Sequence, residues 1–203
     1  SIMEIQKIAG IAAITVCGTT GEAVTMTPEE QTQIIKACVI TSGKMKVIAG
    51  AGTNDTKRAL YQSQAAEDAG ADALLIVTPY YNKPTQKGLI EHYTFIADRV
   101  HIPIIMYNVP SRTGVSLLPE TCALLCSHPN INGLKDATGD LSYTSKVLSL
   151  CGDNINVWSG NDDLTVPMMS IGAKGVISVA SNIIPDIIVS ITNFCLSDKF
   201  GEA

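Results

Sequence analysis

Short apolar runs rich in Val and Ile alternate along the whole chain with longer stretches of helical spacing. Seven of these runs are predicted strands: Ile11 to Cys17, Lys46 to Gly50, Ala73 to Thr78, Ile102 to Asn108, Asn132 to Lys135, Asn156 to Gly160 and Gly175 to Ala180. Since most of their positions are apolar, both faces of the sheet are expected to be covered. The alternation predicts a parallel sheet packed against helices, an α/β fold.

Start and stop signals for helices fall between the predicted strands. Thr27-Pro28-Glu29-Glu30 combines an N-cap threonine, a proline at the first helical position and a capping-box glutamate. Asp140 and Asp162 are candidate caps of later helices, and Gly70 and Gly172 each follow a helical run. These signals support one helix after each strand.

A closed barrel and an open doubly wound sheet both fit this alternation. Side chains able to do chemistry follow many different strands: Thr19, Thr20, Tyr80, Tyr81, Tyr107, Arg112, Lys135, Asn161 and Asp162. Such a distribution is typical of the carboxyl-terminal face of a barrel, whereas a doubly wound sheet concentrates its site at one switch point. Gly50-Ala51-Gly52-Thr53-Asn54-Asp55 lacks the third glycine of a dinucleotide fingerprint, so it predicts only a tight turn.

Composition narrows the possible partners. The 203 residues are 46% hydrophobic and 16% charged, with a net charge of -5 and no cluster of Lys or Arg. Neither nucleic acid nor an anionic membrane surface is therefore an expected partner, and no apolar stretch approaches the roughly 20 residues that span a bilayer. The chain is expected to be soluble and cytoplasmic, and a small metabolite is the favoured ligand.

Six cysteines lie in apolar segments, which predicts buried free thiols in a reducing compartment. Cys122, Cys126 and His128 are close in sequence, but no second ligand pair accompanies them, so they are interpreted as core residues. The acidic residues Glu22, Asp136, Asp162 and Asp163 also lack ligand spacing and are interpreted as caps and packing partners. No metal site is predicted.

Lys135 is the residue with the most chemical information. It stands near the end of an apolar run, Ile131 to Thr138, where a charge is costly to bury. An amine in such surroundings has a lowered pKa, and a neutral amine can attack a ketone to form an imine. The alternative is a lysine that reaches solvent at the strand exit or pairs with Asp136.

Five strings of residues resemble one enzyme family over nearly the whole chain, in that family's order. The strings are Gly18-Thr19-Thr20-Gly21-Glu22, Thr78-Pro79-Tyr80-Tyr81-Asn82-Lys83-Pro84, Tyr107-Asn108-Val109-Pro110-Ser111-Arg112-Thr113-Gly114, Gly133-Leu134-Lys135-Asp136-Ala137-Thr138 and Gly175-Val176-Ile177-Ser178-Val179. They resemble the dihydrodipicolinate synthases, members of the pyruvate-dependent class I aldolases. Arg112 favours the synthases over the related sugar-acid lyases.

The resemblance implies a reaction that joins pyruvate to aspartate 4-semialdehyde, giving 4-hydroxy-tetrahydrodipicolinate for lysine (diaminopimelate) biosynthesis. Lys135 would form the imine with pyruvate, so no separate cofactor is expected. Tyr107, Thr20 and Tyr81 would relay protons, with Tyr81 supplied by a neighbouring subunit. A homo-oligomer, a dimer of dimers in the family, is therefore implied.

The resemblance also implies a substrate-binding set around these residues. Thr19 and Thr20 would hold the pyruvate carboxylate, and Arg112 would hold the carboxylate of the semialdehyde. Gly160 would contribute a backbone carbonyl and Ile177 an apolar wall.

The chain departs from the family in its length. The family fold is a (β/α)8 TIM barrel, which needs roughly 250 residues, and Ile2 to Ile8 reads as a helix with no strand before it. We therefore expect residues 1–203 to form a single barrel domain of a longer chain, lacking the first strand and the C-terminal helical extension. Two alternatives stay open: another pyruvate-dependent aldolase, such as N-acetylneuraminate lyase or a keto-deoxy sugar acid aldolase, and a catalytically inactive truncated barrel.

Overall fold

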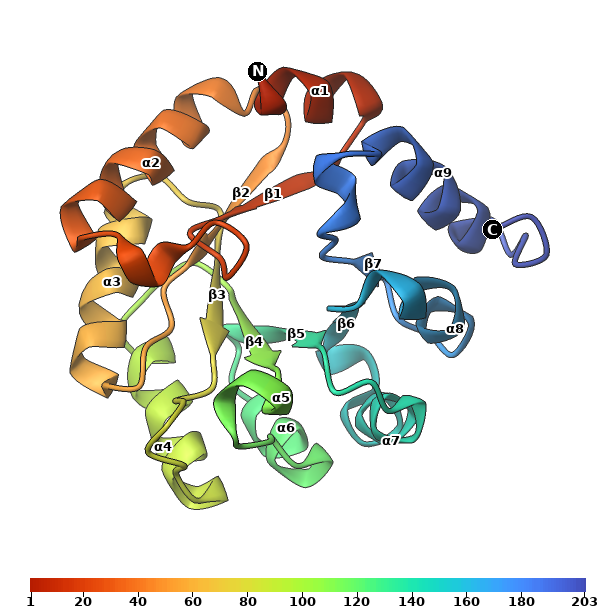
Figure 1. Ribbon diagram of the computed structural model, residues 1–203. Helices are drawn as coiled ribbons and strands as arrows, with labels where there is room; N and C mark the ends of the chain where they lie inside the picture. Colours follow the sequence, from red (N-terminus) through yellow and green to blue (C-terminus); the bar gives the residue numbers. More distant parts are fainter.

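The computed structural model describes all residues, 1–203, as a single parallel sheet with helices around it (Figure 1). The seven strands pair in chain order, so each strand lies beside the next one in sequence. The strands are β1 (Ala13–Val16), β2 (Lys46–Gly50), β3 (Ala73–Val77), β4 (Ile104–Asn108), β5 (Ile131–Asp136), β6 (Asn156–Ser159) and β7 (Gly175–Val176). All seven predicted strands and the parallel α/β fold are confirmed.

A helix follows each strand, two helices lie between β4 and β5, one helix precedes β1, and together they form an arc outside the sheet (Figure 1). The α-helices are α1 (Ile2–Ala9), α2 (Pro28–Thr41), α3 (Thr56–Asp68), α4 (Gln86–Ala97), α5 (Pro110–Thr113), α6 (Pro119–Leu125), α7 (Leu141–Cys151), α8 (Thr165–Ser170) and α9 (Pro185–Leu196). Short 3₁₀ helices are η1 (Ala23–Thr25), η2 (Gly152–Asn154), η3 (Asp162–Leu164) and η4 (Ala180–Asn182).

The predicted helix signals are confirmed in α2 and α7. The Thr27 hydroxyl accepts the Glu30 backbone N–H and the Glu30 carboxylate accepts the Thr27 backbone N–H, which completes the capping box of α2. Asp140 caps α7 by accepting the Ser142 N–H at 2.8 Å. Asp162 was predicted to cap a helix in the same way, and this is wrong, because it lies inside η3 and Asn161 precedes that turn.

The strands bury side chains on both faces, but the two faces are unequal. Leu74 and Ile76 of β3 are completely buried in the large cluster between the sheet and the helices. Leu75, between them, points to the inner face, where only a small cluster around Ile105 and Tyr107 fills the space. This alternation is what a strand covered on both sides requires. The thinly filled inner face leaves room for a pocket at one end.

The sheet has two free edges, because β1 pairs only with β2 and β7 only with β6. Helix α1 confirms the helix predicted over Ile2 to Ile8, and it packs against α9 on the side of these edges (Figure 1). Ile8 and Ile183 remain 85% and 86% exposed there.

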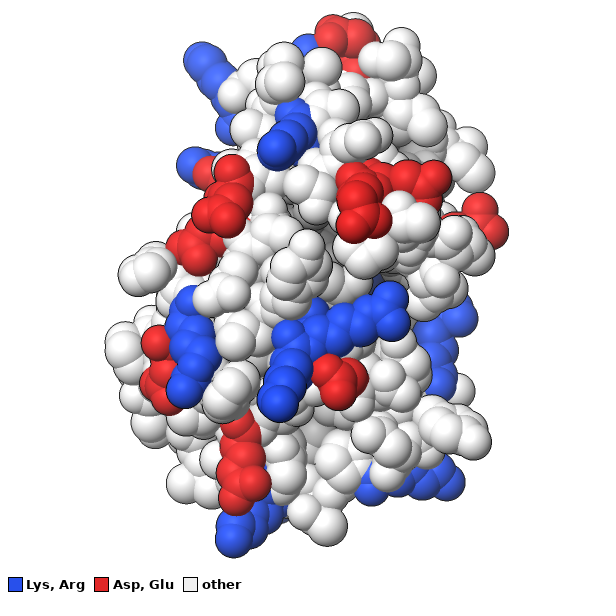
Figure 2. All heavy atoms as spheres, turned by 90° about the vertical axis from the view of Figure 1, so that its left-hand side faces the viewer, with Lys and Arg blue, Asp and Glu red and all other residues white.

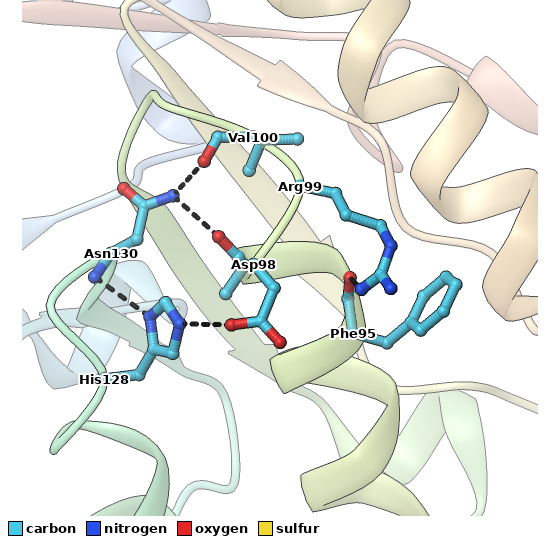
Figure 3. Close-up of polar contacts among 7 residues, drawn as sticks. Phe95, Asp98, Arg99, Val100, His128 and Asn130 are labelled. Atoms are coloured by element: carbon cyan, nitrogen blue, oxygen red, sulfur yellow. Dashed lines mark hydrogen bonds and ion pairs between the residues drawn. The ribbon is translucent and has the colours of Figure 1, made fainter.

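The loops at the amino-terminal ends of the strands are tied by a local polar network (Figure 3). The Asn130 side-chain amide donates to the Val100 carbonyl at 2.9 Å, and the His128 Nε2 lies 3.1 Å from Asp98 Oδ1. Arg99 stacks on the Phe95 ring with its guanidinium carbon 3.9 Å from the centroid. These bonds fasten the segments that lead into β4 and β5, so we assign them to stability, as is usual for this end of a parallel α/β fold.

Charged side chains of both signs are interspersed on the side of the molecule at the left of Figure 1, as Figure 2 shows. Among the surface ion pairs, Lys46 Nζ lies 2.7 Å from Asp72 Oδ1. No helix of the structure is long and apolar enough to cross a membrane. All six cysteines are free thiols, five of them buried and Cys38 half-buried.

Candidate active site

A pocket of about 590 Å³ opens at the carboxyl-terminal ends of the strands. Its walls come from segments that follow all seven strands. Seven of the eight predicted site residues line it: Thr19, Thr20, Tyr107, Arg112, Lys135, Gly160 and Ile177. Of the nine chemistry-bearing residues that the sequence places after the strands, all but Tyr81 and Asp162 line the pocket.

Lys135 lies on β5 and points into the pocket from the inner face of the sheet. The residue is only 9% exposed. Burial lowers the pKa of its amine from 10.5 to about 8, with the Arg112 charge lowering it further and Asp162 opposing the change. At pH 7 about a tenth of such amines would be neutral, against fewer than one in a thousand at the ordinary pKa. The structure thus favours a reactive lysine over one that reaches solvent.

Tyr107 lies directly beside Lys135, since the two residues are paired between β4 and β5. The Lys135 Nζ sits 4.5 Å from the centroid of the Tyr107 ring. Burial raises the pKa of the Tyr107 phenol, while Arg112 and the Thr19 side chain lower it. The phenol is thus protonated at neutral pH and can donate a proton or a hydrogen bond within the pocket.

Of the two threonines in the loop after β1, Thr19 is the one whose side chain lowers the pKa of the Tyr107 phenol. The loop that carries both residues begins at Cys17, whose φ of 55° is left-handed and unusual for a residue with a side chain. A Cβ on Gly50 would stand 2.1 Å from the Cys17 carbonyl oxygen, so only glycine lets this turn lie against β2. The left-handed backbone at Cys17 and its close packing against Gly50 therefore position Thr19 and Thr20 at the pocket.

Arg112 is exposed at the pocket rim on the single helical turn α5. That turn starts at Pro110 and ends at Gly114, whose φ of 70° allows the chain to leave the helix. The guanidinium lowers the pKa of both Lys135 and Tyr107, which shows that its field reaches the centre of the pocket. A planar cation at this place is suited to bind a substrate carboxylate.

Gly160 follows β6 and lies against the lysine. A Cβ at this position would stand 2.7 Å from the Ala137 Cβ and 3.2 Å from the Lys135 Cε. The sequence alone offers no reason to select Gly160, and the geometry supplies one: a side chain there would overlap Ala137 and press on the Lys135 side chain. Ile177, after β7, packs with the inner cluster that contains Tyr107 and forms an apolar wall.

The Gly160→Ala variant is expected to slow imine formation at Lys135 about 10- to 100-fold, because the new methyl group overlaps Ala137 and crowds the lysine side chain, so β5 and β6 must shift and the amine is misplaced. The measurement is the rate of pyruvate adduct formation under borohydride, alongside thermal unfolding. Gly201→Ala is the control, since a Cβ there meets nothing within 4 Å. A Gly160→Ala protein that forms the adduct at the wild-type rate would show that the contact is unimportant.

Tyr81 does not line this pocket. It is 88% exposed, with a left-handed φ of 72°, and its backbone N–H donates to the Thr113 carbonyl at 3.3 Å. The neighbouring Tyr80 lines the pocket instead. The tyrosine pair therefore splits, with one ring facing this chain's pocket and the other facing outward.

The acidic residues near the pocket have structural partners. The Asp136 carboxylate accepts the Thr138 N–H at 2.9 Å and the Thr144 hydroxyl at 2.6 Å. The Asp162 carboxylate, after β6, accepts the backbone N–H groups of Val179 and Ala180, after β7, at 3.0 Å each. The local sequence around Asp162 does not predict this connection. No group of three or more His, Cys, Asp or Glu side chains comes together in the geometry of a metal site.

Fold and pocket together define the class of the chain: a parallel, barrel-like α/β protein with a buried lysine of lowered pKa at the carboxyl ends of its strands. The chain belongs to the dihydrodipicolinate synthetase family, whose model matches residues 2–203. The predicted family is thereby confirmed.

Individual relatives agree with this assignment. A 4-hydroxy-tetrahydrodipicolinate synthase from Geobacter sulfurreducens is 52% identical over 193 residues, which are 95% of this chain and 67% of that protein. The dihydrodipicolinate synthase of Acinetobacter baumannii, solved in complex with pyruvate, superposes with a TM-score of 0.97 at 43% identity, over all of this chain and 70% of that one. The enzyme from Aquifex aeolicus gives a TM-score of 0.97 at 44% identity, with the same coverage. The chain thus spans about two thirds of the length of these relatives.

Proposed function

We propose that this chain is a 4-hydroxy-tetrahydrodipicolinate synthase that condenses pyruvate with aspartate 4-semialdehyde. One observation carries the proposal: Lys135 is buried in the pocket, with a pKa of about 8, beside Tyr107. The family membership supports the substrates, because the matching proteins are named as synthases of this product and one was solved with pyruvate.

The reaction begins when the neutral Lys135 amine attacks the C2 ketone of pyruvate and water leaves. The product is a protonated imine, which withdraws electrons so that the pyruvate methyl group can lose a proton and become an enamine. The enamine carbon attacks the aldehyde carbon of the semialdehyde and forms the new carbon–carbon bond. The substrate amine then closes the ring by attacking the imine carbon, and this releases Lys135.

Binding and proton transfer are divided among the other pocket residues. Thr19 and Thr20 hold the pyruvate carboxylate through hydroxyl and backbone N–H groups. Tyr107 passes protons to and from the imine and the new hydroxyl group, and its interaction with Thr19 makes that threonine a second candidate for the relay assigned to Thr20. The Gly160 carbonyl and Ile177 complete the site.

We propose that Tyr81 completes the relay in the pocket of a second copy. Its ring is 88% exposed, and its loop is held against the end of α5, so it is available to another subunit. This assignment requires at least two copies of the chain, and we propose the dimer of dimers that the family resemblance implies. The six free thiols support the cytoplasm as the compartment.

The finer architecture is also a proposal. The seven strands correspond to strands two to eight of a (β/α)8 barrel, and the gap between the edges of β1 and β7 is the place of the first strand. Two observations support this: those edges have no partner strand, and the segments that contact each other near them, α1 and η4 with α9, leave Ile8 and Ile183 exposed. A C-terminal helical extension would continue beyond α9.

The proposal is tested by the choice of aldehyde. The protein is incubated with pyruvate and aspartate 4-semialdehyde, and separately with pyruvate and an aldose, and pyruvate consumption is followed. We expect pyruvate to be consumed with the semialdehyde and not with the aldose. Turnover only with the aldose would assign a sugar-acid aldolase or lyase instead. Absence of turnover in a protein that forms the Lys135 adduct would assign an inactive barrel.

Arg112→Lys is expected to raise the KM for the semialdehyde about 10- to 100-fold, because an ammonium cannot make the paired hydrogen bonds of a guanidinium to a carboxylate. The substitution keeps a positive charge near Lys135 and Tyr107, so the pyruvate adduct should form at nearly the wild-type rate. Steady-state kinetics with each substrate varied in turn measure the KM for the semialdehyde and the KM for pyruvate separately. An equal rise in both KM values would contradict selective recognition of the semialdehyde.

A further inference from the structure

The Arg112 loop, residues 109–118, connects β4 to α6 and includes α5. A buried side chain closes its base: Asn108, the last residue of β4, is completely buried. The Asn108 amide oxygen accepts the Leu117 N–H at 3.1 Å, and the amide nitrogen donates to the Ser116 hydroxyl at 3.3 Å. The two ends of the loop are therefore fixed to each other.

The base of the Arg112 loop is also bonded to Gln86, the first residue of α4. The Gln86 Nε2 donates to the Ser116 carbonyl at 2.8 Å. The Gln86 Oε1 accepts the Leu118 N–H at 3.1 Å and the Thr121 hydroxyl at 2.6 Å. Both acceptor positions of the amide oxygen are thus used. These three bonds hold the end of the Arg112 loop against the beginnings of α4 and α6.

The tip of the Arg112 loop contacts the chain between β3 and α4. The Tyr81 N–H donates to the carbonyl of Thr113, the residue after Arg112, at 3.3 Å. The Lys83 side chain crosses the end of α5, since a Cβ on Gly114 would stand 3.1 Å from the Lys83 Cε. One short segment, which ends at the start of α4, therefore holds the loop at its tip and at its base.

We propose that Gln86 is a positioning residue for the second substrate: it fixes the Arg112 loop so that the Arg112 guanidinium meets the carboxylate of aspartate 4-semialdehyde. The inference rests on the proposed function, which assigns that carboxylate to Arg112. Gln86 does not line the pocket and forms no bond to substrate. Arg112 is exposed on a single helical turn, so its place depends on the loop that carries it.

Two variants of Gln86 remove its hydrogen bonds to different extents. Gln86→Met keeps a side chain of similar length and removes all three bonds. Gln86→Glu keeps the oxygen that accepts two of them and loses only the donor to the Ser116 carbonyl. Gln64→Met is the matched control, because the Gln64 amide also donates to a loop carbonyl, that of Arg99 at 3.3 Å, but on the exposed side of α3.

The first measurement is steady-state kinetics with each substrate varied in turn. Gln86→Met is expected to raise the KM for the semialdehyde about 10-fold, because a small displacement of Arg112 weakens its paired hydrogen bonds to the carboxylate. Gln86→Glu should cause a smaller rise and Gln64→Met none. Pyruvate adduct formation at Lys135 should keep its wild-type rate in all three. A wild-type KM for the semialdehyde in folded Gln86→Met would contradict the proposal.

The second measurement tests whether Gln86 acts through Arg112. Gln86→Met is combined with Arg112→Lys, which already lacks the guanidinium. The KM for the semialdehyde should rise little beyond that of Arg112→Lys alone, because the group that Gln86 positions is gone. The same fold-change in both backgrounds would overturn the proposal and leave Gln86 with a role in stability only.

Hydrogen exchange tests the positioning step without any substrate. Backbone amides of residues 110–118 should exchange several-fold faster in Gln86→Met than in the wild type, because the Leu118 N–H loses its acceptor and the loop opens more often. Gln64→Met should match the wild type there. Unchanged exchange in folded Gln86→Met would overturn the proposal. A wild-type protein that exchanges as expected but does not turn over the semialdehyde would count against the proposed function instead.

Discussion

Lys135→Ala is expected to lower kcat/KM for the condensation by about 10⁴-fold or more, equivalent to at least about 5 kcal/mol of transition-state stabilisation. The reason is covalent: without the amine there is no imine, and no other lysine lines the pocket. The variant should fold, since removal of a buried amine relieves its desolvation. Steady-state rates with both substrates, together with thermal unfolding, measure the two effects separately.

Lys135→Arg is the matched variant. It keeps a long cationic side chain, but a guanidinium stays protonated and forms no imine with a ketone at neutral pH. We expect both variants to be equally inactive. If Lys135→Arg retained more than about a hundredth of the wild-type rate, the lysine would act through its charge and the covalent mechanism would be refuted.

Tyr107→Phe should lower turnover about 10²- to 10⁴-fold, the range usual for loss of a positioned general acid or base. The aromatic ring that packs 4.5 Å from the Lys135 Nζ is retained, so the change isolates the hydroxyl group. Because burial holds the phenol protonated, the steps that need a proton donor should slow most. Single-turnover kinetics with pyruvate alone, and then with both substrates, resolve those steps.

Tyr93→Phe is the control for this prediction. Tyr93 is completely buried away from the pocket, and its hydroxyl donates to the Ile76 carbonyl at 2.9 Å, within the cluster between sheet and helices. Losing that bond should reduce stability by about 1 kcal/mol and leave turnover unchanged. Similar losses of turnover in both variants would mean that Tyr107 acts through the fold and not through proton transfer.

The fold was predictable because its strongest determinants are local. A parallel sheet covered on both faces needs strands that are apolar at consecutive positions, and β3 and β4 display this directly. Predicted boundaries were less accurate where the chain turns into the pocket. The first strand was predicted to include Cys17, whose left-handed φ of 55° ends it one residue earlier. The last was predicted to reach Ala180, but β7 ends at Val176.

The candidate site was only partly predictable. Lys135 stands out in the sequence because a charge in an apolar strand violates the pattern of its surroundings. Gly160 does not, since its importance comes from the position of the Lys135 side chain in space. Asp162 was misjudged for a similar reason: the donors to its carboxylate lie 17 and 18 residues further along the chain. Contacts between separate loops cannot be inferred from local spacing.

Trapping of the imine tests the central claim most directly. The wild type is incubated with pyruvate, reduced with borohydride and examined by intact-protein and peptide mass spectrometry, with Lys135→Ala in parallel. The account predicts a mass gain of one reduced pyruvate, mapped to Lys135 and absent from the variant. A folded wild-type protein that gains no such mass, or gains it at another lysine, would contradict the account.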